Sequence, residues 1–197
     1  VGVGVYAGVL GVSVDIRNNL IYDNTNQGLV INNGGLTTGY RVENNTIYQG
    51  AGDAVKAEGN AQNVKLANNI LWVGDGHGIN MEDNSQQGFG SDYNLFYLAG
   101  TPGASWIGLW EGIEFGDLEG WSYDLGFDQH SVMADPLFVD PDAGDFHLQS
   151  TQGSFNPNRF HIDPETGEVI LDPAIDNLDS PSIDAGDPLS DYLGERW

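Results

Sequence analysis

Four aromatic residues recur along the first half of the chain at a nearly constant interval, and their chemistry suits the binding of sugars. They are Tyr22, Tyr48, Trp72 and Tyr97. Tyrosine and tryptophan combine an apolar ring with a polar tip, so an outward row of them can stack on sugar rings. We therefore expect a carbohydrate-binding surface here. The alternative is that the second half of the chain packs against the row.

Three aspartates gathered around one turn could supply oxygen ligands to a metal ion. They are Asp140, Asp142 and Asp145, and carboxylate oxygens are the ligands that calcium prefers. Their spacing departs from the EF-hand loop, which places a glycine and a distal glutamate at fixed positions. Two interpretations stay open: a calcium site, or aspartates that cap a turn. No cofactor is required by any motif of the chain.

The few basic residues define a further candidate site. Arg41 and Lys65 occupy the same position of a repeat, and a lyase that acts on uronates needs such a base, usually together with calcium. However, Asp15 continues the same column, and Arg17 faces Glu43 in a neighbouring one. We therefore expect ion pairs between successive repeats rather than a lyase site.

The aromatic and basic residues are positioned by a repeat in the first half of the chain. Near-copies of one stretch occupy residues 14–22, 40–48, 64–72 and 89–97. Each copy carries a marker asparagine: Asn19, Asn45, Asn69 and Asn94. The markers step by 26, 24 and 25 residues, and a period of this size indicates stacked supersecondary units.

Each repeat alternates apolar and polar residues, breaks at Asn-Asn, and then resumes with apolar residues, as two short strands around a bend would. A further short strand follows a glycine in each repeat, at Gly4, Gly28, Gly52 and Gly78. The pattern predicts an all-β fold, a parallel β-helix of about four coils. Each strand would bond to its equivalent one coil away, ~4.8 Å along the axis.

Aligned positions predict the interior of this β-helix. The expected core columns are Val14, Tyr40, Val64 and Phe89; Ile16, Val42 and Leu66; and Ile21, Ile47, Leu71 and Phe96. The marker asparagine should adopt the left-handed backbone conformation of a sharp bend. Its amide should also bond to the same amide in the next coil, forming a ladder. Repetition at every coil favours a structural role for these asparagines over a catalytic one.

The second half of the chain loses the repeat. We expect residues 1–97 to form the coils, and residues 98–197 to form a capping or covering segment of the same domain. Residues 117–125 predict a short helix that begins after Asp117 and stops at Gly126. Residues 135–150 predict two short strands, and residues 160–171 predict a hairpin.

Residues 1–10 are mainly apolar and match about half of a coil. The chain is therefore expected to be a piece of a longer protein or to self-associate end to end.

Charge restricts the partners of the chain. It holds 6 basic and 29 acidic residues, a net charge of −23. Nucleic acid is therefore excluded as a partner, because few side chains could release phosphate counterions, and an anionic membrane surface would repel the chain. No apolar run is long enough to insert into a membrane. The chain has no cysteine, which removes disulfides and thiolate metal sites.

The repeats resemble those of bacterial secreted right-handed parallel β-helix proteins, in the broad pectate-lyase-like superfamily. Residues 135–138, 144–148 and 180–187 are similar to the closing segments of its large surface members. The resemblance implies an extracellular or cell-surface protein. It does not select an activity, since the superfamily includes lyases, hydrolases, epimerases and adhesins.

One stretch resembles part of the polygalacturonase signature: residues 52–56 followed by Gly76-His77-Gly78. The resemblance implies catalytic roles for Asp53, Asp75 and His77 in hydrolysis by inversion. The match is incomplete, because the paired aspartates are reduced to Asp53 and the Arg-x-Lys of the following coil is missing. We therefore expect a scaffold or binding module of a larger surface protein that interacts with polysaccharide or surface glycan. The alternatives are a polysaccharide-degrading hydrolase or lyase, and a subunit of an end-to-end surface assembly.

Overall fold

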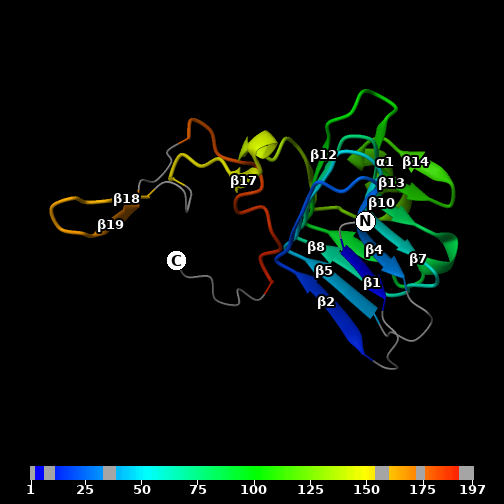
Figure 1. Cartoon of the computed structure of the whole chain (residues 1–197). Coiled ribbons are helices and arrows are strands. Elements are labelled where there is room, and N and C mark those ends of the chain that lie inside the picture. The colour runs from blue at the N-terminus through cyan, green and yellow to red at the C-terminus, as the bar shows by residue number, and fades with distance from the viewer. Residues whose placement is uncertain (1–2, 7–11, 33–38, 154–159, 172–175, 191–197) are drawn as a thin grey trace. The chain divides into compact units, whose positions relative to one another are not determined.

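The computed structural model describes residues 3–6, 12–32, 39–153, 160–171 and 176–190 (Figure 1). Their contacts divide the chain into two compact units. One comprises residues 1–134 with 185–197, and the other comprises residues 135–184.

Three sheets build the first unit, and successive coils add neighbouring strands to each of them (Figure 1). The six-stranded sheet consists, in spatial order, of β1 (Val3–Tyr6), β4 (Gln27–Asn32), β7 (Asp53–Glu58), β10 (Gly76–Met81), β13 (Ser105–Trp110) and β14 (Ile113–Phe115). The four-stranded sheet consists of β11 (Gly90–Asp92), β8 (Val64–Ala67), β5 (Gly39–Glu43) and β2 (Ser13–Arg17). The five-stranded sheet consists of β15 (Val132–Met133), β12 (Leu95–Leu98), β9 (Ile70–Val73), β6 (Thr46–Gln49) and β3 (Leu20–Ile21).

Strands at equivalent positions of successive coils pair in parallel and in register, so the predicted parallel β-helix is confirmed. Tyr40 pairs with Val64, and Ile47 pairs with Leu71. Only β14 runs antiparallel to its neighbour in the six-stranded sheet. The predicted core columns are buried, apart from half-buried Val14 in β2. Burying each large apolar side chain contributes about 1.5–3 kcal/mol, so the columns hold the stack together.

The sequence pattern predicts that one asparagine of each Asn-Asn bend has both the left-handed backbone and the ladder hydrogen bonds. In the structure, each of the two asparagines has one of these features. Left-handed backbone occurs at the first asparagine, with φ of +57° at Asn18, +58° at Asn44 and +57° at Asn68. The ladder is formed by the second. Asn45 Nδ2 donates to Asn69 Oδ1 at 3.0 Å, and Asn69 Nδ2 donates to Asn94 Oδ1 at 3.0 Å. The predicted ladder is confirmed, but the left-handed conformation was assigned to the wrong asparagine.

The ladder ends at an aspartate rather than at another asparagine. Asp128 is 1% exposed, and its Oδ1 accepts hydrogen bonds from Asn94 Nδ2 at 3.0 Å and Ser91 Oγ at 2.9 Å. Its Oδ2 accepts from the buried Trp121 Nε1 at 2.9 Å. Trp121 belongs to α1 (Leu118–Leu125), which Asp117 caps by accepting from the Gly120 N–H. The predicted helix is therefore confirmed, and its tryptophan closes the last coil.

The second unit contains the two hairpins that the sequence predicts. β16 (Phe138–Asp140) pairs antiparallel with β17 (Asp145–Leu148), on either side of the 3-10 turn η2 (Pro141–Ala143). β18 (Phe160–Ile162) pairs antiparallel with β19 (Val169–Leu171). Beyond this unit the chain returns to the coils, where the Asp187 N–H donates to Asn68 Oδ1 at 2.8 Å.

Candidate functional site

Asp53 and His77 meet on neighbouring strands of the six-stranded sheet. Asp53 is the first residue of β7 and His77 the second of β10. Asp53 Oδ1 accepts from the His77 backbone N–H at 3.2 Å and from the ring Nδ1 at 2.7 Å. Asp53 Oδ2 accepts from Asn80 Nδ2 at 2.8 Å. Both carboxylate oxygens of Asp53 therefore accept hydrogen bonds, and the bond with Nδ1 fixes the orientation of the imidazole.

Asp53 and His77 shift each other's pKa values in opposite directions. Burial raises the pKa of Asp53, but hydrogen bonds from His77 and Asn80 outweigh it and hold that pKa below its usual value. Burial lowers the pKa of His77, but the hydrogen bond and charge of Asp53, with a smaller effect of Glu114, raise it overall. Each partner therefore stabilises the charged form of the other.

The second ring nitrogen of His77 is left for another partner. Nε2 lies 3.6 Å from Glu114 Oε1, which is outside hydrogen-bond distance. Within the described part of the chain, this buried nitrogen makes no hydrogen bond. Glu114 lies on β14, and its side chain is about half exposed. A ligand group placed between the two residues would therefore meet an imidazole nitrogen and a carboxylate.

An indole lies beside this imidazole. Trp106 of β13 pairs in register with His77, and its side chain is half-buried. A Cβ at Gly116 would lie 3.4 Å from Trp106 Cζ3, so the glycine leaves room for the ring. We call the surface formed by Lys56, His77, Asn80, Trp106 and Glu114 the His77 face.

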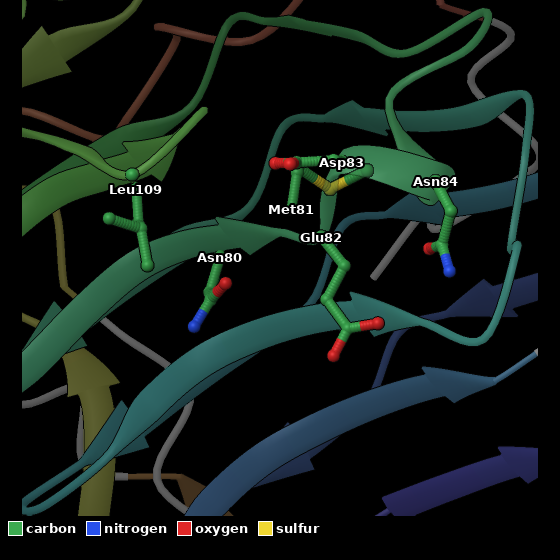
Figure 2. Close-up of a pocket in the computed structure, with 7 residues that line it drawn as sticks. Asn80, Met81, Glu82, Asp83, Asn84 and Leu109 are labelled. Atoms are coloured by element: carbon green, nitrogen blue, oxygen red, sulfur yellow. The ribbon is translucent and has the colours of Figure 1, made fainter.

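An open hollow of about 440 Å³ continues the His77 face toward the end of β10. Figure 2 shows Asn80 and Leu109, which pair in register across β10 and β13, at one side of it. The lining residues are Asn80, Met81, Glu82, Asp83, Asn84, Leu109 and Gly112. Asn80 belongs to both the hollow and the His77 face. The two therefore form one continuous surface along β10.

The cation of this surface is already paired. Lys56 Nζ lies 2.8 Å from Glu58 Oε2 and 3.9 Å from Glu82 Oε1. The hydrogen bond that Lys56 donates to Glu58, opposed by burial and supported by neighbouring carboxylates, raises the pKa of Lys56. Lys56 is therefore charged but neutralised by its neighbours.

The third predicted catalytic residue does not join the pair. Asp75 is exposed, and its backbone carbonyl accepts from the Gly52 N–H at 2.6 Å. Among the described contacts, its carboxylate bonds to neither Asp53 nor His77. Sequence reasoning in turn missed Asn80, Trp106 and Glu114. Asn80 alone left a signal, since it lies three residues after His77 and close to the same motif.

The predicted aromatic column forms a continuous stack of rings on the five-stranded sheet. Tyr48 pairs with Trp72, which pairs with Tyr97. The rings of Tyr48 and Trp72 are parallel within 17°, with centroids 3.9 Å apart. Trp72 and Tyr97 are tilted, with centroids 6.3 Å apart. Tyr22, beyond the end of β3, is 42% exposed. The faces of Tyr48 and Trp72 are thus turned toward each other, so a sugar at this pair would meet mainly ring edges.

The aspartates predicted as calcium ligands serve the turn around η2. Asp140 Oδ1 accepts from the Ala143 N–H at 3.2 Å. Asp145 Oδ1 accepts from the His147 N–H at 3.1 Å and lies 2.5 Å from its Nδ1. Asp142 is exposed. Among the described residues, no group of three or more acidic, histidine or cysteine side chains is placed to hold a metal. Calcium binding stays a prediction.

The basic residues of the four-stranded sheet form the predicted ion pairs between coils. Arg17 lies 2.9 Å from Glu43, and Arg41 lies 3.6 Å from Asp15. These side chains are partly exposed, so each pair adds at most about 1 kcal/mol. The predicted ion pairs are confirmed, and they occupy the arginines that a lyase site would need.

In the described part of the chain, no helix is both long and apolar enough to span a membrane. No curated protein and no solved structure matches this sequence. A family model described as "Right handed beta helix region" matches residues 2–104, which are more than half of the chain. Together with the parallel register of the coils, this match shows that the chain belongs to the right-handed β-helix family.

Proposed function

We propose that this β-helix is an extracellular or cell-surface scaffold that binds carbohydrate on its His77 face. The observation that carries the proposal is a fixed imidazole with an unused nitrogen beside a half-buried indole. Asp53 holds His77 from one side, and Nε2 makes no hydrogen bond among the described residues. A scaffold role accords with a fold in which each coil repeats the same ladder.

A hydroxyl group is the natural partner of His77 Nε2. With Nδ1–H bonded to Asp53, Nε2 accepts a hydrogen bond when the ring is neutral and donates one when it is protonated. A hydroxyl can do either, so it satisfies both states. Glu114 can accept from an adjacent hydroxyl, because its Oε1 lies 3.6 Å from Nε2. Adjacent hydroxyls above an apolar ring face are the pattern of a sugar, and Trp106 supplies the matching aromatic surface.

The aromatic column is a second proposed binding surface. Tyr48 and Trp72 stack on each other, and Tyr97 is tilted against Trp72. We propose that a glycan there contacts ring edges and phenolic hydroxyls rather than the stacked faces. The His77 face is the stronger candidate, because it joins an indole with the neighbouring polar atoms of His77 and Glu114, which lie 3.6 Å apart. The two surfaces lie on different sheets, so substitutions in one should leave the other intact.

Binding can be measured by affinity electrophoresis in gels that contain a polysaccharide. His77→Gln should weaken retention about tenfold, since the loss of one hydrogen bond worth about 1.4 kcal/mol has that effect. His130→Gln is a matched control, because His130 also pairs with an aspartate, Asp92, through Nδ1 at 2.7 Å. Equal retention of the wild type and His77→Gln on every polymer that binds would place the ligand elsewhere.

A second candidate function is polysaccharide hydrolysis, which the contact between Asp53 and His77 favours. Inverting hydrolases need one carboxylic acid whose pKa is raised so that it can protonate the leaving oxygen. Asp53 has a lowered pKa, so the proton donor would have to be His77. Release of reducing ends or unsaturated products from a polysaccharide panel, lost in Asp53→Ala and His77→Ala, would establish catalysis. A scaffold should release neither.

A further inference from the structure

We infer that the glycan bound on the His77 face is uncharged, and that uronate polymers are excluded from it. This inference rests on the proposed carbohydrate binding and names its ligand class. It is carried by the distribution of charge along β7, β10 and β14. In addition, the described strands of the six-stranded sheet hold no lysine or arginine other than Lys56, which is already paired.

Negative side chains border the His77 face on both sides. Glu114 stands beside Nε2, and the hollow is lined by Glu82 and Asp83. A uronate carboxylate placed against His77 would meet the Glu114 carboxylate at close range. Like charges within a few ångström repel strongly in a partly desolvated site. The arrangement therefore opposes an anionic ligand.

The positive groups of this face are already neutralised. Lys56 is held by Glu58 and Glu82, and Asp53 pairs with His77. Lys56 is the sole lysine or arginine within the described strands of the six-stranded sheet. Recognition of a carboxylate normally uses the paired N–H groups of an arginine. No arginine lies in these strands, so a uronate would lose its hydration without gaining a salt bridge.

An uncharged sugar fits the same groups without this penalty. Its hydroxyls can pair with His77 Nε2 and with Glu114, and its apolar ring face can lie against Trp106. The neighbouring hollow offers the Asn80 amide and the apolar Leu109 side chain (Figure 2). Hydrogen-bonding groups next to apolar surface are what a neutral ring requires. We therefore place successive sugar units along β10, from His77 toward Glu82.

The test compares neutral and uronate polymers by affinity electrophoresis of the whole chain. Xylan, mannan, β-glucan and galactan are the neutral probes, and polygalacturonate and alginate are the anionic ones. All runs contain a chelator, so that calcium cannot bridge acidic polymer to acidic protein, and they are repeated at low and high salt.

We expect retention by at least one neutral polymer, at least tenfold weaker in His77→Gln and little changed by salt. Uronate polymers should not retain the protein. Uronate retention that His77→Gln removes would overturn the inference while leaving carbohydrate binding at this face intact. Retention by none of the six polymers would overturn the proposed binding itself, and the inference with it.

A charge variant supplies an independent check. Glu114→Gln removes the negative charge beside Nε2 and keeps a side chain of the same shape. It should increase uronate retention at low salt while changing neutral retention less. Asp124→Asn is the control, since it removes one charge from α1, outside the strands of the six-stranded sheet. Equal gains in the two variants would show that net charge, and not the His77 face, excludes uronates.

Discussion

The pairing of Asp53 with His77 is the residue-level feature on which the proposed site depends. The two side chains come from positions 24 residues apart, and stacking of successive coils makes them neighbours. Their shared hydrogen bonds are charge-assisted and largely buried, so each contributes more than an exposed ion pair would. The pair fixes the orientation of the imidazole and leaves its buried Nε2 without a hydrogen bond among the described residues.

This pair predicts a pH dependence of stability. The raised pKa of His77 means that its contribution is fully present below the unfolded value of 6.5 and is lost as pH rises through the folded pKa. The lowered pKa of Asp53 means that its contribution is present above 3.8 and is lost as pH falls through its folded pKa. The wild type should therefore exceed His77→Gln in unfolding free energy most clearly at about pH 5, by about 1–3 kcal/mol.

Urea unfolding at a series of pH values measures this difference. It should shrink as pH rises through the folded pKa of His77, because the imidazole is then neutral in both states. A difference that stays constant from pH 5 to about pH 9 would show that the pair is not ionised as described.

The ladder asparagines yield a second residue-level prediction. Asn69 is 1% exposed. Its Oδ1 accepts from the backbone N–H and side chain of Asn45, and its Nδ2 donates to Val42 O and Asn94 Oδ1. Asn69→Ala leaves these buried groups unpaired, which should cost roughly 3 kcal/mol.

Asn68→Gly is the matched control, because glycine readily adopts the left-handed backbone found there. It loses only the hydrogen bond from Asp187, so it should cost about 1 kcal/mol or less. Chemical denaturation of both variants measures the contrast. Similar losses in the two would contradict the division of tasks within the Asn-Asn bend.

At the scale of elements, the aromatic column stabilises the five-stranded sheet from outside. The stack of Tyr48 on Trp72 continues the register of β6 and β9, and stacked aromatic pairs add about 0.5–1.5 kcal/mol beyond the area that they bury. Trp72→Ala should therefore lower the unfolding free energy by roughly 1–3 kcal/mol.

Glycan-array binding of the same variant distinguishes packing from recognition. If the His77 face is the binding surface, Trp72→Ala keeps its array signal while it loses stability. Loss of signal in a folded variant would move the ligand to the aromatic column. No change in either measurement would mean that the column is neither a binding platform nor a packing surface.

At the scale of the whole molecule, the repeat made the coils predictable, because equivalent residues occur at steps of 24 to 26. Columns such as Ile47 and Leu71 could be aligned without a structure, and so could the ion pair of Arg17 with Glu43. The bend was only partly predictable, since two adjacent asparagines can exchange the left-handed and ladder roles without altering the pattern.

The candidate site was predictable only where the repeat persists. Asp53 and His77 lie in regular coils, and their motif drew attention to both. Trp106 follows His77 by 29 residues, after the repeat has been interrupted by the turn at residues 99–103. Glu114 reaches the site because β14 turns back antiparallel onto β13. A period-based alignment contains no sign of that reversal, so Trp106 and Glu114 were placed only by the strand pairing.

The central claim is that His77 presents Nε2 to an uncharged glycan, and the most direct test is retention of three proteins in gels containing each neutral polymer. The account predicts that wild type and His130→Gln are retained alike by at least one polymer, and that His77→Gln loses at least about tenfold in affinity. Equal retention of all three proteins, or retention by none of the neutral polymers, would contradict it.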